Sequence, residues 1–269
     1  MNSTFLALTA AVLYLLSGGL IGVRLFRGHA QKGVRRILPL FVGLVGCVAH
    51  GVMLYQNIIV PEGLNLGFFN AFSLVAWTIV LLLLSTSLFS PVENLGIAIL
   101  PLAVLAIFLD LRFPNNHVLP QTTALGMKIH ILVSLLAYSL MTLASVQAIL
   151  LAIQDHHLHS RQPGGFIRAL PPLQTMENLL FEMIGVGFVL LTLSLISGFT
   201  YLDNMFAQHV AHKTILSIVA WFVFATLLWG RFRYGWRGRT ALIWTLSGFV
   251  VLMLAYFGSK AVIELILKK

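Results

Sequence analysis

The sequence is poor in charged residues and contains a single cysteine. Charged side chains make up 9% of the 269 residues and hydrophobic ones 59%. A soluble domain carries about 25% charged residues, so this composition predicts a polytopic membrane protein. With Cys47 alone, an internal disulfide, a CxxC redox pair and a thiolate metal cluster are excluded. Covalent c-type haem attachment is excluded as well, because GCVAH around Cys47 lacks the second cysteine of CxxCH.

Acidic residues are also scarce, and those that approach the apolar segments fall near their ends. Examples are Asp110, Glu182, Asp203 and Glu264. Ion-coupled transporters tend to place carboxylates near the membrane midplane, so this placement counts against a small-solute transporter. The chain has no phosphate loop, nucleophile elbow or HExxH motif, and we expect no enzyme.

The excess of positive charge sets the expected topology. A net charge of +9 would fit nucleic-acid binding, but the lysines and arginines fall between apolar segments, where they orient spanning helices. The first connection holds five of them, the third none, the fifth two and the seventh four. The positive-inside rule therefore places these connections in the cytoplasm and both termini outside. No positive residue precedes the first apolar run, which argues for a spanning helix and against a cleavable signal peptide.

The predicted fold is all-α, a polytopic membrane bundle of about eight transmembrane helices. A spanning helix needs about 20 apolar residues. We expect one integral membrane domain over 1–269, with no nucleic-acid partner and the lipid bilayer as its surroundings. The segments that meet or approach this length are 4–24, 37–58, 67–89, 95–110, 126–154, 178–201, 212–230 and 240–266.

The longest connection, 154–177, contains Pro163-Gly164-Gly165 and Pro171-Pro172 and is expected to be a flexible cytoplasmic loop. Three histidines lie at its start, beside Asp155. We interpret them as residues of a solvated loop, not as a metal cluster: His156, His157 and His159.

One stripe of small and polar side chains marks the fifth segment. Steps of three and four from His130 reach Ser134, Ala137 or Tyr138, Met141 and Ser145. Helix contacts in membranes favour small residues and hydroxyls, so the stripe is expected to face protein, with the serines as packing residues. For the histidine a functional role is favoured, because an ionisable side chain inside a span is costly and usually faces a cavity or a partner.

Two further histidines are expected at similar depth near the outer face. His50 lies in the outer half of the second segment, and His212 opens the seventh. Neutral imidazole is a common metal ligand, and a haem iron can take one on each side. Residue spacing does not show that any two of the three approach each other. A joint site with His130 and isolated, hydrogen-bonded histidines both stay open.

Three stretches carry a family resemblance. KIHILVSLLAYSLMTLASVQAILLAIQ, from Lys128, resembles the His-x-x-x-Ser-x-x-x-Tyr helix of the cytochrome c assembly family, with its CcsA-, ResC- and HemX-like members. Met176-Glu177-Asn178 followed by IGVGFVLLTLSLISG resembles the next helix of that family, and GWRGRTALIWTLSGFVVLMLAYFG its last one. The core of the likeness covers about 60–266. It implies a haem-handling membrane protein in which His130 matches the outer-side axial histidine.

The chain departs from the haem-lyase members of that family. Those members carry a tryptophan-rich WWD segment before the seventh helix, whereas TYLDNMFAQHVAHKT contains no tryptophan here. The last segment ends in SKAVIELILKK, without the second outer histidine. The likeness is therefore to the shortened, HemX-like members, and the resemblance does not extend to the presentation of haem to an apocytochrome.

The resemblance implies a bacterial inner-membrane protein related to cytochrome c biogenesis. We expect non-covalent binding or transfer of b-type haem, with His130 as first axial candidate, then His212 and His50. Other cytochrome assembly or membrane proteins are expected partners. The alternative is a non-catalytic scaffold or regulator of the HemX type that has lost the cofactor.

Overall fold

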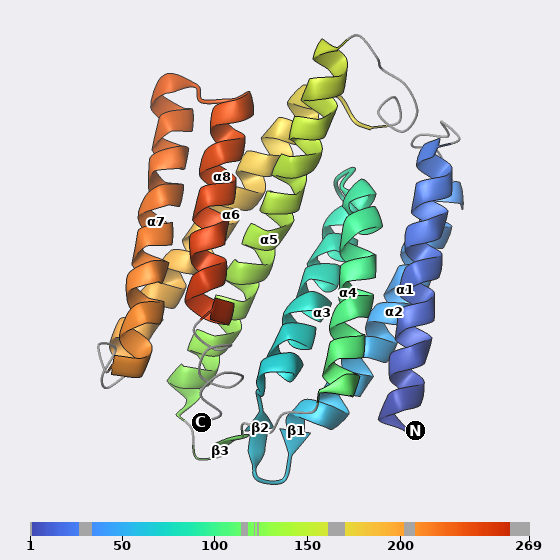
Figure 1. Cartoon of the computed structure of the whole chain (residues 1–269), viewed down its shortest axis with the longest axis vertical. Coiled ribbons are helices and arrows are strands. Elements are labelled where there is room, and N and C mark those ends of the chain that lie inside the picture. Colours follow the sequence, from blue (N-terminus) through green and yellow to red (C-terminus); the bar gives the residue numbers. More distant parts are fainter. Residues whose placement is uncertain are drawn as a thin grey trace. The chain divides into compact units, whose positions relative to one another are not determined.

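Membrane-length helices make up most of the protein. The computed structural model describes residues 2–26, 34–113, 118–120, 122, 124–160, 170–201 and 208–258. Within these residues eight helices are long and apolar enough to cross a membrane (Figure 1). The prediction of an all-α polytopic bundle is confirmed. The orientation of the termini stays a prediction.

The helices are grouped in two compact units. The first comprises Met1–Gln121 with His156–Pro172, and the second comprises Thr122–Asp155 with Leu173–Lys269. Each unit contains four of the eight candidate spans, counted over the described residues. The expectation of a single integral membrane domain over 1–269 stays a prediction.

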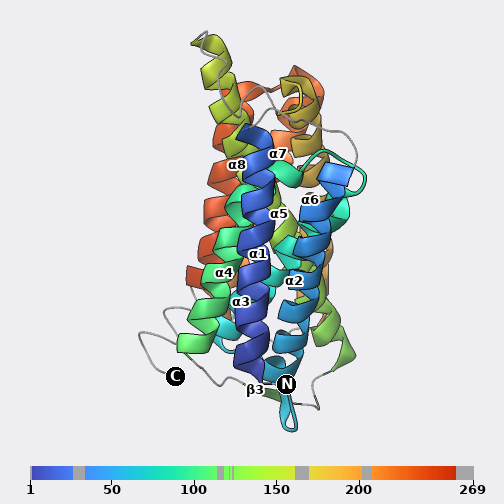
Figure 2. The same ribbon diagram turned by 90° about the vertical axis from the view of Figure 1, so that its right-hand side faces the viewer.

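The first unit is a bundle of four antiparallel helices (Figure 2). α1 packs against α2 and α4, and α3 packs against α2 and α4. α1 and α2 approach closely because Gly43 and Gly46 of α2 face the side chains of Ser17 and Tyr14 on α1. The helices are α1 (Ser3–Phe26), α2 (Val34–Ile58), α3 (Phe68–Ser87) and α4 (Gly96–Arg112), the last preceded by the 3₁₀ turn η1 (Glu93–Leu95).

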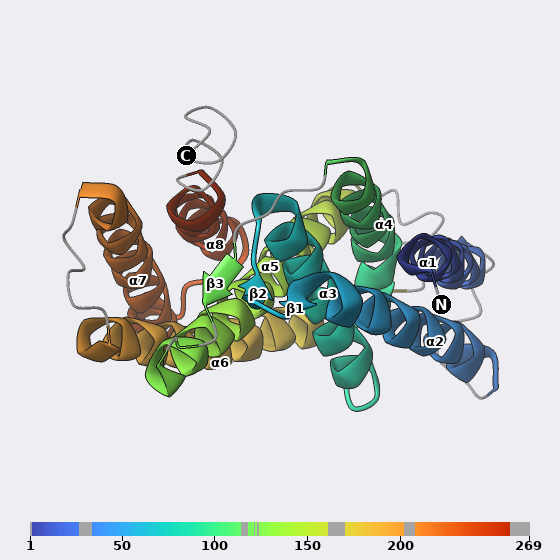
Figure 3. The ribbon, with the colours of Figure 1, turned by 90° about the horizontal axis from the view of Figure 1, so that it is seen from below.

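A small antiparallel sheet closes one end of the first unit. Its strands are β1 (Ile59–Val60), β2 (Gly63–Asn65) and β3 (Val118–Pro120), in the order β1-β2-β3 (Figure 3). β1 follows α2 directly, and β2 pairs with both neighbours. The hydropathy pattern did not predict these strands, because two or three residues are too few to show an alternation.

The second unit carries the remaining long helices, except for the last four residues of α5, which are grouped with the first unit. These helices are α5 (Leu125–His159), α6 (Leu173–Tyr201), α7 (Gln208–Tyr234) and α8 (Gly238–Met253), continued by the π-helical segment η3 (Leu254–Gly258). α7 packs on α6 and α8. Hydrogen bonds tie α5 to α6, including one from Gln147 Nε2 to the carbonyl oxygen of Met176 at 3.0 Å. Side-chain bonds thus join helices whose apolar faces alone would not fix a register.

The end of α5 differs from the expectation. The helix continues to His159, so His156, His157 and His159 lie on a helix, and their interpretation as loop residues is wrong. The physical reason is that residues 127–162 contain no glycine or proline, so the hydrogen bonds of the helix continue past the apolar residues that end near Gln154. Several positive residues of the connections lie outside the described part of the chain: Arg27, Lys32, Arg161 and Arg168. So do Asp203, Glu264 and all residues of the last segment beyond 258.

Close helix packing in the second unit gives a direct test. A Cβ atom on Gly248 of α8 would lie 2.8 Å from the ring of Phe224, which is fully buried on α7. Gly248→Ala is expected to destabilise the protein by about 1–2 kcal/mol, because the ring has to leave a filled position. Unfolding in mixed detergent micelles measures this loss. Gly185→Ala on α6 is the matched control, since no atom lies within 4 Å of its added Cβ. Equal stability of the two variants would contradict the packing.

Candidate haem-ligand site

His130 lies in the second turn of α5, half-buried against the last turns of α6. Its Nδ1 lies 3.0 Å from the carbonyl oxygen of Ser194 and 3.0 Å from Oγ of Ser197. A carbonyl oxygen only accepts hydrogen bonds, so the ring must donate an N–H from Nδ1 to it. In a neutral imidazole the proton is then on Nδ1, and Nε2 keeps its lone pair.

The other nitrogen of His130 is available to a ligand. Within the described part of the chain, Nε2 has no hydrogen-bond partner. An imidazole whose Nδ1–H is held by a backbone carbonyl while Nε2 carries the lone pair is the usual arrangement of a metal-binding histidine. The carbonyl fixes both the tautomer and the plane of the ring. The arrangement is therefore chemically ready for an axial bond to iron.

Serines build the surroundings of this histidine. Ser134 Oγ donates to the carbonyl oxygen of His130 at 2.6 Å and lies 2.6 Å from Oγ of Ser194. Ser197 Oγ donates to the carbonyl oxygen of Ser194 at 2.9 Å. The serines thus join α5 to α6 and orient the imidazole, and of the predicted stripe Ser134 takes part in this contact.

An aromatic cluster lies further along the same helix. The Tyr138 ring centroid is 5.9 Å from Phe249 of α8, 5.9 Å from Tyr256 and 5.5 Å from Phe257. Tyr138 follows His130 by eight residues, about 12 Å along the helix axis. The cluster was not predicted, because it depends on η3, where the helix widens to a π turn. Such turns recur at functional sites.

His212 is the second predicted ligand of this unit. It lies in the first turns of α7 and is exposed. α7 begins soon after α6 ends, so His212 belongs to the same end of the unit as Ser197 and His130. The side chain of neighbouring His209 lies outside what the structure describes.

His50 belongs to the first unit and has a different environment. It is fully buried, with Nδ1 3.3 Å from the hydroxyl of Tyr14 and Nε2 3.0 Å from Oγ of Ser73. Both ring nitrogens are therefore engaged, and an iron would have to displace one of these hydroxyls. The role of His50 as an axial ligand stays a prediction. Tyr14 and Ser73 were missed, because hydroxyl residues inside apolar helices carry no sequence signal of their own.

Among the residues that the structure describes, no group of three or more His, Cys, Asp or Glu side chains could hold a metal ion. A haem iron needs only one or two axial imidazoles, because the porphyrin supplies the other four nitrogens. A single imidazole with a free Nε2, as at His130, could serve as one such axial ligand.

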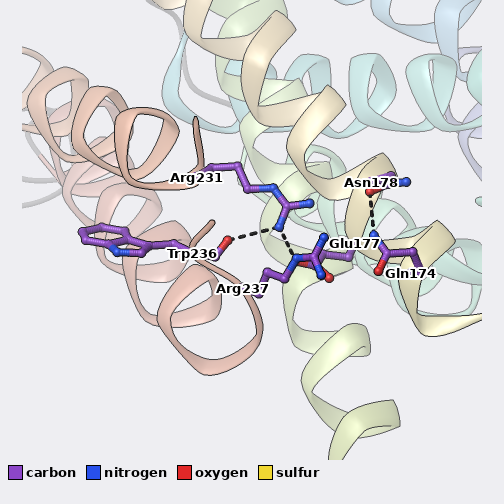
Figure 4. Close-up of polar contacts among 6 residues, drawn as sticks. All are labelled: Gln174, Glu177, Asn178, Arg231, Trp236 and Arg237. Carbon is purple, nitrogen blue, oxygen red and sulfur yellow. Dashed lines mark hydrogen bonds and ion pairs between the residues drawn. The ribbon is translucent and has the colours of Figure 1, made fainter. Parts of the chain in front are cut away.

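The opposite end of α6 carries a cluster of ionic groups (Figure 4). Arg231 Nη1 donates to Glu177 Oε1 at 2.7 Å and to the carbonyl oxygen of Trp236 at 3.2 Å. Arg237 Nε lies 3.5 Å from the same carboxylate oxygen. The guanidinium of Arg231 also lies 4.4 Å from the ring centroid of Phe181. This cluster ties α6 to the turn between α7 and α8.

Comparison with known proteins places the chain in a family. The model of the cytochrome c assembly protein family matches residues 39–267. The chain belongs to this family. The inner membrane protein YpjD of Escherichia coli K12 is 34% identical over 267 residues, which cover 97% of this chain and 98% of that protein. The cytochrome c biogenesis protein CcsA of Gloeothece citriformis is 31% identical over 109 residues, 40% of this chain and 33% of the relative. No solved structure matches the chain.

Family membership confirms the expected class and location. The eight apolar helices of the described residues, together with the likeness to an inner-membrane protein along almost the whole chain, make this cytochrome c assembly protein a multi-pass protein of the bacterial inner membrane. Membership also supports a role related to cytochrome c biogenesis. His130 lies within the matched range, on the helix that carried the resemblance.

Proposed function

We propose that this protein binds b-type haem non-covalently in the inner membrane and holds or transfers it during cytochrome c assembly, with His130 Nε2 as the first axial ligand. The observation that supports this most is the bond from His130 Nδ1 to the Ser194 carbonyl oxygen at 3.0 Å, which leaves Nε2 free to bind. When bound, the haem would supply an iron with an open axial position. The chain itself orients the imidazole through Ser194 and Ser197.

His212 is the second axial candidate and His50 the third. His212 shares its unit and its end of that unit with His130, and its exposure on α7 leaves it accessible to a cofactor. His50 is enclosed, and both of its nitrogens are already hydrogen-bonded. Loss of His212 should therefore reduce haem binding more than loss of His50, if the latter variant folds.

A haem titration of the purified protein tests the proposal. The wild type is expected to develop a Soret band that saturates at a fixed haem stoichiometry. His130→Ala should lower the affinity at least about tenfold, equivalent to about 1.4 kcal/mol. His156→Ala is the matched control, since His156 is an exposed histidine near the other end of α5. If His130→Ala and His156→Ala bind as the wild type does, the ligand assignment is wrong.

The alternative is a scaffold or regulator that keeps the fold without the cofactor. The engagement of both nitrogens of His50 favours it, as does the absence of tryptophan from residues 200–214. This reading predicts no haem uptake by the wild type, together with a defined protein partner that remains bound in mild detergent. Haem saturation of the wild type would rule it out.

A further inference from the structure

The turn between α7 and α8, residues 235–237, is closed by backbone hydrogen bonds. Gly235, with φ of 68°, ends α7, and its N–H donates to the carbonyl oxygen of Arg231 at 3.1 Å. The N–H of Trp236 donates to the carbonyl oxygen of Gly230 at 3.2 Å. The first bond is that of the αL motif, in which a glycine at positive φ follows the last helical residue and closes the helix. The Trp236 ring packs on Gly230 and lies 5.5 Å from the ring of Trp244.

The turn carries more positive charge than its surroundings neutralise. Of the four arginines in and beside the turn, Arg231 forms the shortest ion pair with Glu177, with side-chain exposures of 20% and 7%. Arg237 is 58% exposed and touches the same oxygen only through Nε. Arg233 and Arg239 are exposed and have no ion-pair partner in the part of the chain that the structure describes. Three guanidinium groups are therefore presented outward within seven residues.

These arginines lie at the membrane surface. The candidate spans end at Tyr234 and begin again at Gly238, so the turn is located where lipid headgroups are found. Trp229, Phe232 and Tyr234 are exposed around it, and exposed aromatic side chains are typical of the interface between membrane and water. A guanidinium binds phosphate in a bidentate manner through two parallel N–H···O bonds.

We propose that Arg233, Arg237 and Arg239 bind the phosphate headgroup of an anionic phospholipid. The partner is a lipid and not an acidic protein segment, because the arginines lie directly between two spans and among interfacial aromatic residues. Topology alone would require only positive charge at this position. A binding site additionally requires the bidentate geometry of arginine and a backbone held in place, and the hydrogen bonds of Gly235 and Trp236 hold this turn. The site lies in the second unit, at the end of α7 opposite to His212, and does not depend on haem.

Lipid titration of the full-length protein in a neutral detergent tests this proposal. Native mass spectrometry compares added phosphatidylglycerol with phosphatidylcholine. The wild type is expected to prefer phosphatidylglycerol at least about fivefold, and higher salt should weaken this preference. In R233Q/R237Q/R239Q the preference should disappear, and in R233K/R237K/R239K it should be reduced but present, because lysine keeps the charge and loses the bidentate geometry.

Arg112→Gln is the matched control, because Arg112 is an exposed arginine in the last turn of α4 in the other unit. This variant should keep the full preference. If the triple glutamine variant does not fold, the lysine variant and the three single glutamine variants test the proposal. In each of them the preference for phosphatidylglycerol is expected to fall at least about twofold. A wild type that binds both lipids equally would overturn the proposal, and so would a folded triple glutamine variant that keeps the wild-type preference.

Discussion

Glu93→Gln is expected to destabilise the protein by about 3–5 kcal/mol, the usual cost of leaving one partner of a buried ion pair alone. Arg24 Nη2 donates to Glu93 Oε1 at 2.8 Å, and the two side chains are only 8% and 3% exposed. Within the described residues Glu93 is the carboxylate that pairs with Arg24, and Nε of Arg24 is buried there without a hydrogen-bond partner. Free energies of unfolding from mixed-micelle SDS titrations measure the effect.

Two further variants test whether the loss comes from the buried charge of Arg24. Glu62→Gln is the matched control, because Glu62 is exposed in the turn between β1 and β2, and it should change stability by no more than about 0.5 kcal/mol. The double variant R24L/E93L should be more stable than Glu93→Gln, since it removes both buried charges. A Glu93→Gln protein as stable as Glu62→Gln would contradict the ion pair.

Glu177→Gln is expected to cost about 3 kcal/mol, the lower end of the range for buried ion pairs, because Arg231 is one-fifth exposed. The loss has two sources. The guanidinium of Arg231 loses a charge-assisted hydrogen bond of 2.7 Å. Without the carboxylate, α6 is also no longer tied to the turn that follows α7. Thermal unfolding followed by tryptophan fluorescence is a suitable measurement, since Trp236 is part of this turn.

Glu182→Gln is the matched control for this second ion pair. Glu182 lies on the same helix five residues later and is exposed. Its replacement should leave the melting temperature nearly unchanged. If both glutamine variants melt at the same temperature, Glu177 does not hold the turn.

Much of the architecture could be predicted from composition alone. Each membrane span requires about 20 apolar residues, and the eight predicted segments correspond to helices, with boundaries that differ most at α5 and α6. α6 begins at Leu173, before the apolar part, because polar residues such as Glu177 are stabilised there by ion pairs from another helix. Such pairing involves residues far apart in the sequence, so hydropathy does not reveal it.

The candidate site was predictable only in part. His130 was singled out because an imidazole inside a span is costly, but the partner that fixes its tautomer is a backbone carbonyl, which no sequence pattern displays. Likewise, the sequence marked His50 without its partners Tyr14 and Ser73. Glu93 and Glu177 were not recognised as ion-pair partners, since acids near helix ends are usually solvated. Side-chain partners, and not element positions, are what the sequence left undetermined.

The most direct test of His130 as an iron ligand is chemical complementation. His130→Gly removes the imidazole and leaves room where it packs against Ser197. The Soret and EPR spectra of this variant with haem should differ from those of the wild type, and added free imidazole should restore the wild-type spectra in a saturable manner. A His130→Gly protein whose spectra match the wild type without imidazole would contradict the assignment of His130 as axial ligand.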